Sequence, residues 1–244
     1  MATVLFPLPD RDFDVTEVAV PWRLLRDAGH EPVFASEAGA PPACDPLLIT
    51  GVVFGKLGAQ PEAIAFYREL EQDASFKSPR TWSACRADDF DALFLAGGHA
   101  PGMKQYLGSD VVQQLTAGFF AARKPVAAIC HGALVAARSR RADGASVLHG
   151  HKTTCLPKYM ERAAYFSTFW RRGRYYRTYP TYVEDEVRAS LAAADDFVRG
   201  PRELSRRGTR DDDSHAFCVE SDHYISARWP GDAYLFSKRF AALL

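Results

Sequence analysis

The 244-residue sequence lacks the features of a membrane or nucleic-acid-bound protein. It has no run of about 18 consecutive apolar residues, the length that a bilayer-spanning helix requires. It also has no basic segment followed by an apolar stretch and a small-residue cleavage site at its N-terminus, so we expect no signal peptide. Thirty Lys and Arg residues balance 30 Asp and Glu residues, which excludes a body held to nucleic acid by charge alone. We therefore expect a cytoplasmic protein with neither nucleic acid nor a membrane as partner.

The sequence is also poor in cofactor motifs. Its five cysteines are odd in number and include no CxxC pair, which argues against a disulfide framework or a zinc finger. His149, His151 and Cys155 could supply three metal ligands, but without a paired motif around them we favour a polar turn entering a strand. The glycines at 97–98 lack the GxGxxG spacing of a dinucleotide-binding turn. The sequence therefore predicts no metal and no other cofactor.

The chain does contain short apolar runs that alternate with helical patterns. The runs predict strands that are apolar on both faces, at residues 3–7, 32–35, 92–96 and 126–129. Helical spacing predicts helices at 15–28, 61–70, 111–122, from near 131, at 183–194 and at 232–244. Residues 216–220 and 224–227 are expected to form a hairpin. This order predicts an α/β fold with a parallel sheet covered by helices on both sides.

Two segments interrupt this regular order. Residues 36–60 carry glycine, proline and few periodic positions, and residues 156–182 are crowded with aromatic residues and arginines. We interpret both as excursions from the sheet that cap a pocket near the active site. The length then fits one domain, residues 1–244, with insertions.

The strand at 126–129 runs directly into Cys130, and the small residues Gly132 and Ala133 then open a helix. A sharp strand-to-helix turn needs small residues for clearance. It places the cysteine at the carboxyl edge of the sheet, where open α/β sheets bind ligands. The N–H groups and dipole of the following helix would favour the thiolate. The pattern predicts a nucleophile, although a cysteine at a buried strand end can also serve packing alone.

Two further segments are expected at the same edge of the sheet. The strand at 92–96 ends in Gly97 and Gly98, whose backbone can approach a ligand and whose N–H groups can hold an oxyanion. Glu17 begins the helix after the first strand, where a buried carboxyl beside a thiol would have a raised pKa and could move a proton. The spacing Asp14-x-x-Glu17 also fits a capping box, which would use the glutamate for the helix alone.

Together, Ala128-Ile-Cys-His-Gly132, Ala96-Gly-Gly-His-Ala-Pro-Gly102 and an early Glu17 resemble the DJ-1/PfpI superfamily. The resemblance implies a flavodoxin-like parallel sheet sandwiched by helices, with a C-terminal hairpin. It also implies a nucleophile elbow at Cys130 with His131 beside it and Glu17 hydrogen-bonded to the thiol. The length and the long excursions look more like the larger, Hsp31-type members than the compact ones.

The same resemblance implies an activity. Members of the Hsp31-type branch are associated with cofactor-free glyoxalase III activity, which turns methylglyoxal into lactate, with holdase chaperone activity and with protection against glycation. The first fits these residues: Cys130 would add to the aldehyde as a hemithioacetal, and Glu17 would move a proton between the two carbons through an enediol. The N–H groups of Gly98 and His131 would hold the developing charge, with Gly97 and His99 in the pocket loop.

This sequence departs from the Hsp31-type pattern at the acid that orients the histidine. The matching stretch, Thr153-Thr-Cys-Leu-Pro-Lys158, has a lysine where that branch has an aspartate. Glu161 follows three residues later and could replace this acid if the loop bends toward His131. The late His-x-Glu segment that the related glutamine amidotransferases need is absent, so glutamine hydrolysis is disfavoured.

The segment 165–179 interleaves aromatic residues with arginines. Such a pattern can stack nucleic-acid bases, but we favour an aromatic lid whose arginines face solvent or pair with the acids at 184–186. A partly exposed aromatic surface would also suit a chaperone or the contact of a homodimer. The predicted function is a cysteine-dependent enzyme acting on a small reactive carbonyl in stress protection. Two different functions remain open: a holdase chaperone or redox-sensing module, and a cysteine-dependent amidase or peptidase.

Overall fold

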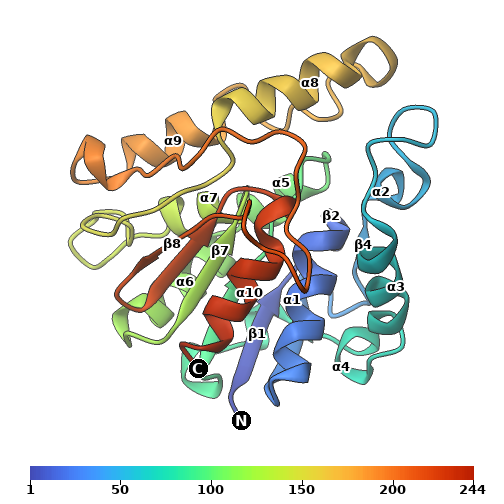
Figure 1. Cartoon of the computed structure of the whole chain (residues 1–244). Coiled ribbons are helices and arrows are strands. Elements are labelled where there is room, and N and C mark those ends of the chain that lie inside the picture. Colours follow the sequence, from blue (N-terminus) through green and yellow to red (C-terminus); the bar gives the residue numbers. More distant parts are fainter.

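The structure is a computed structural model that describes residues 1–244. Its main sheet has seven strands in the order β5-β3-β1-β6-β7-β9-β8 (Figure 1). The strands are β1 Thr3–Pro7, β3 Glu31–Ser36, β5 Arg80–Thr81, β6 Ala92–Leu95, β7 Val126–Ile129, β8 Cys218–Ser221 and β9 Tyr224–Ala227. All neighbours are parallel except β8 and β9, which form the antiparallel hairpin. The predicted flavodoxin-like α/β fold is confirmed.

Helices cover both faces of this sheet. On one face α1 packs against α10, and on the other α6 packs against α7 (Figure 1). The helices that complete these layers are α1 Val15–Asp27, α3 Pro61–Leu70, α4 Ala74–Lys77, α5 Met103–Leu107, α6 Asp110–Ala121, α7 Gly132–Arg138 and α10 Ala233–Ala241. None of the helices is both long enough and apolar enough to cross a membrane.

The register of the central strands brings the predicted site segments together. In the parallel ladder Leu5 lies opposite Leu93, and Leu95 lies opposite Ala128, so β1, β6 and β7 end at the same edge. Every residue of β6 and β7 is buried, as expected for parallel strands covered on both faces. The loop after β6 and the turn after β7 therefore meet at the carboxyl edge, next to the start of α1.

The two predicted excursions lie over this edge. Residues 36–60 contain β4 Ala43–Cys44, which pairs with β2 Arg11–Phe13, and α2 Pro46–Thr50. Residues 156–182 contain α8 Lys158–Arg172, which lies with α9 Val183–Ala189 across the end of the molecule opposite both termini (Figure 1). The two excursions touch where Tyr176 Oη donates to Asp45 Oδ2 at 2.8 Å.

One local prediction in this region is wrong, and one of two predicted alternatives is excluded. The helix expected over 183–194 ends at Ala189, and a short 3₁₀ turn follows at Ala194–Asp196. The acids at 184–186 pair with no arginine of 165–179, because α9 presents them to α7, to the start of α8 and to the loop after α9. Their partners are Arg199 for Glu184, Lys158 for Asp185 and Arg138 for Glu186.

Candidate active site

Cys130 occupies the turn between β7 and α7 with a φ angle of +57°. A residue with a side chain rarely adopts this left-handed conformation, which costs on the order of 1–2 kcal/mol and is typical of strained functional turns. The turn also depends on Gly132, where a Cβ atom would lie 2.2 Å from the Leu95 carbonyl oxygen. A glycine directly after the turn therefore lets α7 begin against β6, and the sharp strand-to-helix junction expected from the sequence is formed.

Glu17 is fully buried and faces this turn. Asp14 caps α1, since its Oδ1 accepts from Thr16 N at 2.8 Å and from Glu17 N at 3.1 Å. The reciprocal half of a capping box is not formed, because Asp14 N donates to the Gly97 carbonyl oxygen at 2.9 Å instead. A Cβ on Gly97 would lie 2.5 Å from Glu17 Oε2 and 2.8 Å from Cys130 Cβ. The carboxyl, the thiol-bearing residue and the glycine backbone thus form one close cluster.

Burial sets the protonation of this cluster. It raises the pKa of Glu17 well above the ordinary value, and the neighbouring Asp14 raises it further. Burial and then the Glu17 carboxylate raise the pKa of the Cys130 thiol well above the ordinary value. The Cys130 thiol and the Gly97 N–H lower the pKa of Glu17, yet neither carboxyl oxygen has a hydrogen-bond partner of normal geometry. Burial of the closed site thus favours the uncharged form of both groups.

The sequence suggested that the helix N-terminus would favour the thiolate at Cys130. The His131 N–H does lower the pKa of the thiol, in the expected direction. Its effect is smaller than that of burial and of the Glu17 charge, so the pKa is raised. The helix N-terminus therefore acts on the thiol in the expected direction, but the desolvation of the closed site outweighs it.

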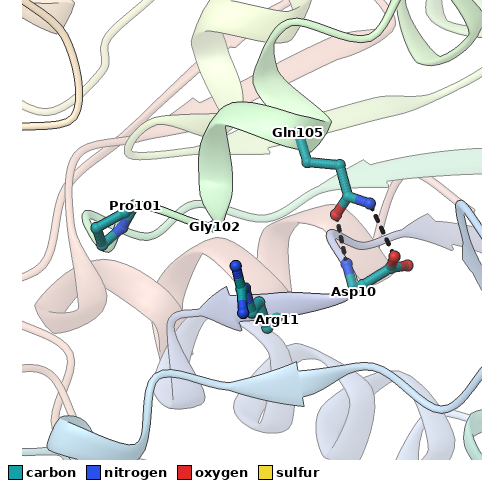
Figure 2. Close-up of a pocket in the computed structure, with 5 residues that line it drawn as sticks. All are labelled: Asp10, Arg11, Pro101, Gly102 and Gln105. Carbon is teal, nitrogen blue, oxygen red and sulfur yellow. Dashed lines mark hydrogen bonds between the residues drawn. The ribbon is translucent and has the colours of Figure 1, made fainter.

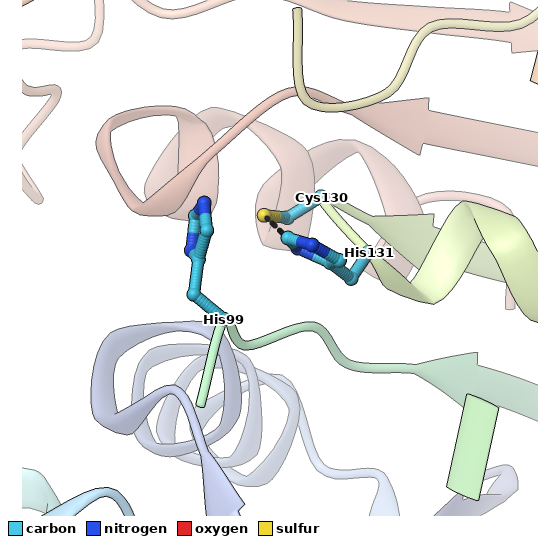
Figure 3. A group of neighbouring side chains, drawn as sticks. All are labelled: His99, Cys130 and His131. Atoms are coloured by element: carbon cyan, nitrogen blue, oxygen red, sulfur yellow. Dashed lines mark hydrogen bonds between the residues drawn. The ribbon is translucent and has the colours of Figure 1, made fainter. Parts of the chain in front are cut away.

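Two neutral imidazoles lie beside the thiol (Figure 3). His131 Nδ1 is 3.5 Å from Cys130 Sγ, and the rings of His99 and His131 meet edge to face with centroids 4.5 Å apart. Burial lowers the pKa of His99 to about 4, and burial together with His99 lowers the pKa of His131 well below its ordinary value. Uncharged rings at neutral pH can accept a proton. The ring nitrogens and the sulfur lie within 4.8 Å of one another, a donor set that zinc also accepts.

Glu161, the proposed replacement acid, makes no hydrogen bond to His131. Its Oε1 accepts from the Arg177 guanidinium, and its Oε2 accepts from Val183 N at 2.9 Å. These bonds join α8 to the start of α9. No carboxylate accepts a hydrogen bond from the ring of His131, whose one side-chain neighbour at bonding distance is Cys130. The loop does not bend as this assignment would require.

The expected oxyanion donors lie at the junction of the two loops. The N–H groups of Gly98 and His131 donate to no backbone carbonyl. The loop that carries Gly98 is held by Thr178 Oγ1, which donates to the His99 carbonyl oxygen at 2.6 Å. Thr178 belongs to the second excursion, so this excursion fixes the position of the loop beside the cysteine.

A cavity of about 320 Å³ opens above His99. Both excursions contribute to its walls, and so does Trp229, which lies two residues after β9. Its larger apolar lining residues are Leu48, Val52, Leu57, Leu156, Met160, Tyr176, Leu204 and Trp229. Cys130 is 1% exposed and does not line the cavity, whereas His99, whose ring contacts that of His131, does.

A second, more polar cavity of about 480 Å³ lies beside β2 and α5 (Figure 2). Asp10 N donates to Gln105 Oε1 at 2.9 Å, and Gln105 Nε2 donates to Asp10 Oδ2 at 2.8 Å. Arg11, Pro101 and Gly102 complete its lining, which contains neither a thiol nor an imidazole. We place the candidate site in the first cavity because His99 connects that cavity to the cysteine.

Sequence reasoning missed three residues that shape the first cavity. Asp14 was considered as a cap and not as a lining residue. Trp229 follows the last strand, and Arg207 lies in the polar loop 199–213, where no periodicity marks a position as inward. No pattern in the sequence could have found Arg207, because an irregular loop sets its position.

Comparisons with known proteins show the family and the fold of the chain. The model of a protein family described as ThiJ/PfpI family-like matches residues 8–201. An uncharacterized protein of Schizosaccharomyces pombe is 27% identical, over 97% of this chain and 82% of its own length. Deglycase PfpI of Pyrococcus furiosus is 25% identical, over 99% of this chain and 98% of its own length. The crystal structure of glyoxalase III from Candida albicans has the same fold, with a TM-score of 0.69 at 18% identity, covering 99% of this chain and 97% of that one.

Proposed function

The chain belongs to the ThiJ/PfpI-like family, and from that premise we propose that it converts a small 2-oxoaldehyde, such as methylglyoxal, into the 2-hydroxy acid. The reaction depends on Cys130, uses no cofactor and serves protection against reactive carbonyls. The observation that carries the proposal is the close cluster of Glu17, Gly97 and Cys130 at the sheet edge. Proteins similar to this chain are named deglycase and glyoxalase III, which supports a carbonyl substrate.

The first step is addition of the thiol to the aldehyde carbon. The Cys130 Sγ–C bond forms, the carbonyl π electrons move to the oxygen, and the thiol proton passes to that oxygen through His131 Nδ1, 3.5 Å from the sulfur. The N–H groups of Gly98 and His131, which donate to no backbone carbonyl, would stabilise the oxyanion while it is charged. The product of this step is a neutral hemithioacetal.

The second step is a proton shift between the two carbons of the bound substrate. In its carboxylate form, Glu17 takes the proton from the former aldehyde carbon and returns it to the neighbouring carbon. The hydroxyl proton of the hemithioacetal passes to the neighbouring carbonyl oxygen, so that the intermediate is an enediol and no proton is gained or lost overall. The result is a thioester on Cys130 and a hydroxyl on the adjacent carbon. A raised pKa makes Glu17 a stronger base than an exposed carboxylate, which suits the weakly acidic C–H bond.

The last step is hydrolysis of the thioester. Water attacks the thioester carbonyl with a neutral imidazole, His99 or His131, as the base. The Cys130 sulfur leaves and regains its proton, and the 2-hydroxy acid is released. The sum of the three steps is the addition of one water to the 2-oxoaldehyde, with no net oxidation.

The test is lactate formation from methylglyoxal by the purified protein. We expect the wild type to form lactate, Cys130→Ser to lose at least about a thousandfold in kcat/KM, and Glu17→Gln to lose about a hundred- to ten-thousandfold. Cys155→Ser is the matched control, because this cysteine is also buried but belongs to a different part of the fold. A wild type that forms no lactate, or a Cys130→Ser variant that retains activity, would contradict the proposal.

A second candidate, a holdase chaperone, is favoured by one surface observation. Aromatic side chains gather outside the cavity on α8 and the first excursion, each 47–71% exposed: Phe54, Phe166, Phe169 and Trp170. Such a patch can bind unfolded apolar chains. Suppression of client aggregation by the Cys130→Ser variant, with loss in a Phe166→Ser/Trp170→Ser variant, would establish this activity independently of the chemistry.

Hydrolysis of amide bonds and redox sensing receive less support from the geometry of the site. An amidase or peptidase would use His131 as base, but no acid orients this imidazole. A redox-sensing cysteine is typically a low-pKa, accessible thiol, whereas the pKa of Cys130 is raised and its exposure is 1%.

A further inference from the structure

We propose that Arg207 binds an anionic group of the substrate, so that the preferred 2-oxoaldehyde carries a carboxylate or phosphate joined to its reactive carbons by an apolar body. This inference rests on the proposed function, because it names the substrate class of the same site. The carboxylate and the phosphate share the chemistry that an arginine recognises.

Arg207 lines the cavity and has no anionic partner there. Its guanidinium carbon lies 5.1 Å from the centre of the Trp229 ring, and no carboxylate lies within ion-pair distance of its nitrogens. Two other buried or half-buried arginines near the second excursion are paired, Arg177 with Glu161 and Arg138 with Glu186. A planar guanidinium with free N–H groups fits two oxygens of a carboxylate or phosphate at once.

Other polar atoms along the same cavity also lack partners. The Trp229 Nε1–H is buried without an acceptor, and His99 Nε2 is buried without a partner. Buried polar atoms are normally satisfied, so these two atoms call for hydrogen-bonding atoms on a bound molecule. Asp14 is the only acid in the lining, and its Oδ1 is already occupied by two backbone N–H groups of α1. The Arg207 end of the cavity is therefore suited to an anion.

The size and lining of the cavity indicate which part of the substrate would lie between its reactive carbonyl and its anionic group. A volume of about 320 Å³ exceeds what a three-carbon aldehyde fills and reaches the range of pockets for larger metabolites. Leu48, Val52 and Met160 give the middle of the cavity an apolar wall. We therefore infer an apolar body between the carbonyl at His99 and the anion at Arg207.

Arg207 could instead act only as a distant counter-ion. The carboxylates of Asp14 and Glu17 raise its pKa, although burial has the larger, opposite effect. In that case Arg207 would influence every substrate equally through the protonation of Glu17. Substrate pairs that differ only in a remote charge separate the two roles.

The experiment compares phenylglyoxal with 4-carboxyphenylglyoxal. We expect the wild type to favour the carboxylated compound in kcat/KM by about tenfold or more, Arg207→Gln to abolish the preference, and Arg207→Lys to retain part of it. Arg202→Gln is the control, since this arginine lies on the same loop outside the cavity. An unchanged ratio in Arg207→Gln, or an equal loss for both compounds with a shifted pH profile, would overturn the inference.

A binding measurement keeps this test separate from the proposed function. 4-Acetylbenzoate and acetophenone differ by the same carboxylate and have no aldehyde to react. Calorimetry with the Cys130→Ala variant should detect tighter binding of 4-acetylbenzoate, lost on adding Arg207→Gln. If 4-acetylbenzoate binds in this way but no 2-oxoaldehyde is turned over, the proposed function is wrong and the anion site is supported. If 2-oxoaldehydes are turned over but binding does not depend on Arg207, the anion site is wrong and the proposed function is supported.

Discussion

Arg138 and Glu186 form a two-point ion pair, with 2.6 Å between Nε and Oε1 and 2.9 Å between Nη2 and Oε2. The same guanidinium donates to the Leu107 carbonyl oxygen at 3.0 Å and lies 4.4 Å from the centre of the Tyr179 ring. Arg138 is in the last turn of α7, the helix that follows Cys130. One side chain thus connects the helix behind the cysteine with the end of α5, with the second excursion and with α9.

Removing the charge of Glu186 should loosen this covering layer. In Glu186→Gln the half-buried Arg138 loses its ionic partner, and we expect the free energy of unfolding to fall by about 1–2 kcal/mol. Amide hydrogen exchange over residues 158–189 should become faster. Asp185→Asn is the control, because the Lys158–Asp185 pair is more exposed and should contribute less than about 0.5 kcal/mol. Equal effects of the two substitutions would contradict the role given to Arg138.

Glu17→Gln should make the Cys130 thiol easier to ionise while stopping catalysis. The Glu17 carboxylate raises the pKa of the thiol, so a neutral amide removes that effect and the thiolate forms at lower pH. Burial remains, and it keeps the pKa above that of an exposed cysteine. The rate of alkylation by iodoacetamide against pH measures the change. An alkylation profile that moves to higher pH would show that Glu17 stabilises the thiolate instead.

Asp14 should make stability depend on pH in the acidic range. Burial raises its pKa from 3.8 to about 6 in the folded protein, so between these values the folded state holds a proton that the unfolded state has released. Stability contributed by this group therefore falls as pH rises from about 4 to 6, by roughly 3 kcal/mol. Asp14→Asn keeps a capping side chain and removes the titration. Urea unfolding should show the variant gaining most over the wild type at pH 7, and an equal difference at pH 4 and 7 would contradict this assignment.

The sequence was sufficient for features that local sterics dictate. Apolar runs on both faces predict β6 and β7, and the small residues after Cys130 predict the turn, because a side chain at Gly132 has no space beside Leu95. These constraints act between neighbours along the chain or across one ladder. The fold class and the edge of the sheet that carries the site follow from them.

The sequence was insufficient where partners come from irregular segments. Asp14-x-x-Glu17 fits a capping box equally well, and only the Gly97 carbonyl, which takes the Asp14 N–H, turns Glu17 inward. Glu161 is occupied by Arg177, a residue 16 positions away beyond the end of α8. Arg207 reaches the cavity from a loop without periodicity. Each of these outcomes depends on loop placement, which hydrophobic patterns do not encode.

Gly97→Ala tests the contact on which the proposed chemistry depends. An added Cβ would lie 2.5 Å from Glu17 Oε2, 2.8 Å from Cys130 Cβ and 2.8 Å from His131 N, so three groups of the site must move at once. We expect the free energy of unfolding to fall by about 1–3 kcal/mol, because the added methyl group overpacks the site. We also expect the rate of lactate formation to fall at least about a hundredfold, because a displacement of about 1 Å between reacting groups can reduce a rate by that factor. Gly144→Ala is the control: its φ of +81° gives backbone strain, but no atom lies within 4 Å of the added Cβ. Comparable destabilisation with full activity in Gly97→Ala would mean that Glu17 and Cys130 need not touch for the reaction, and the proton transfer assigned to Glu17 would then be wrong.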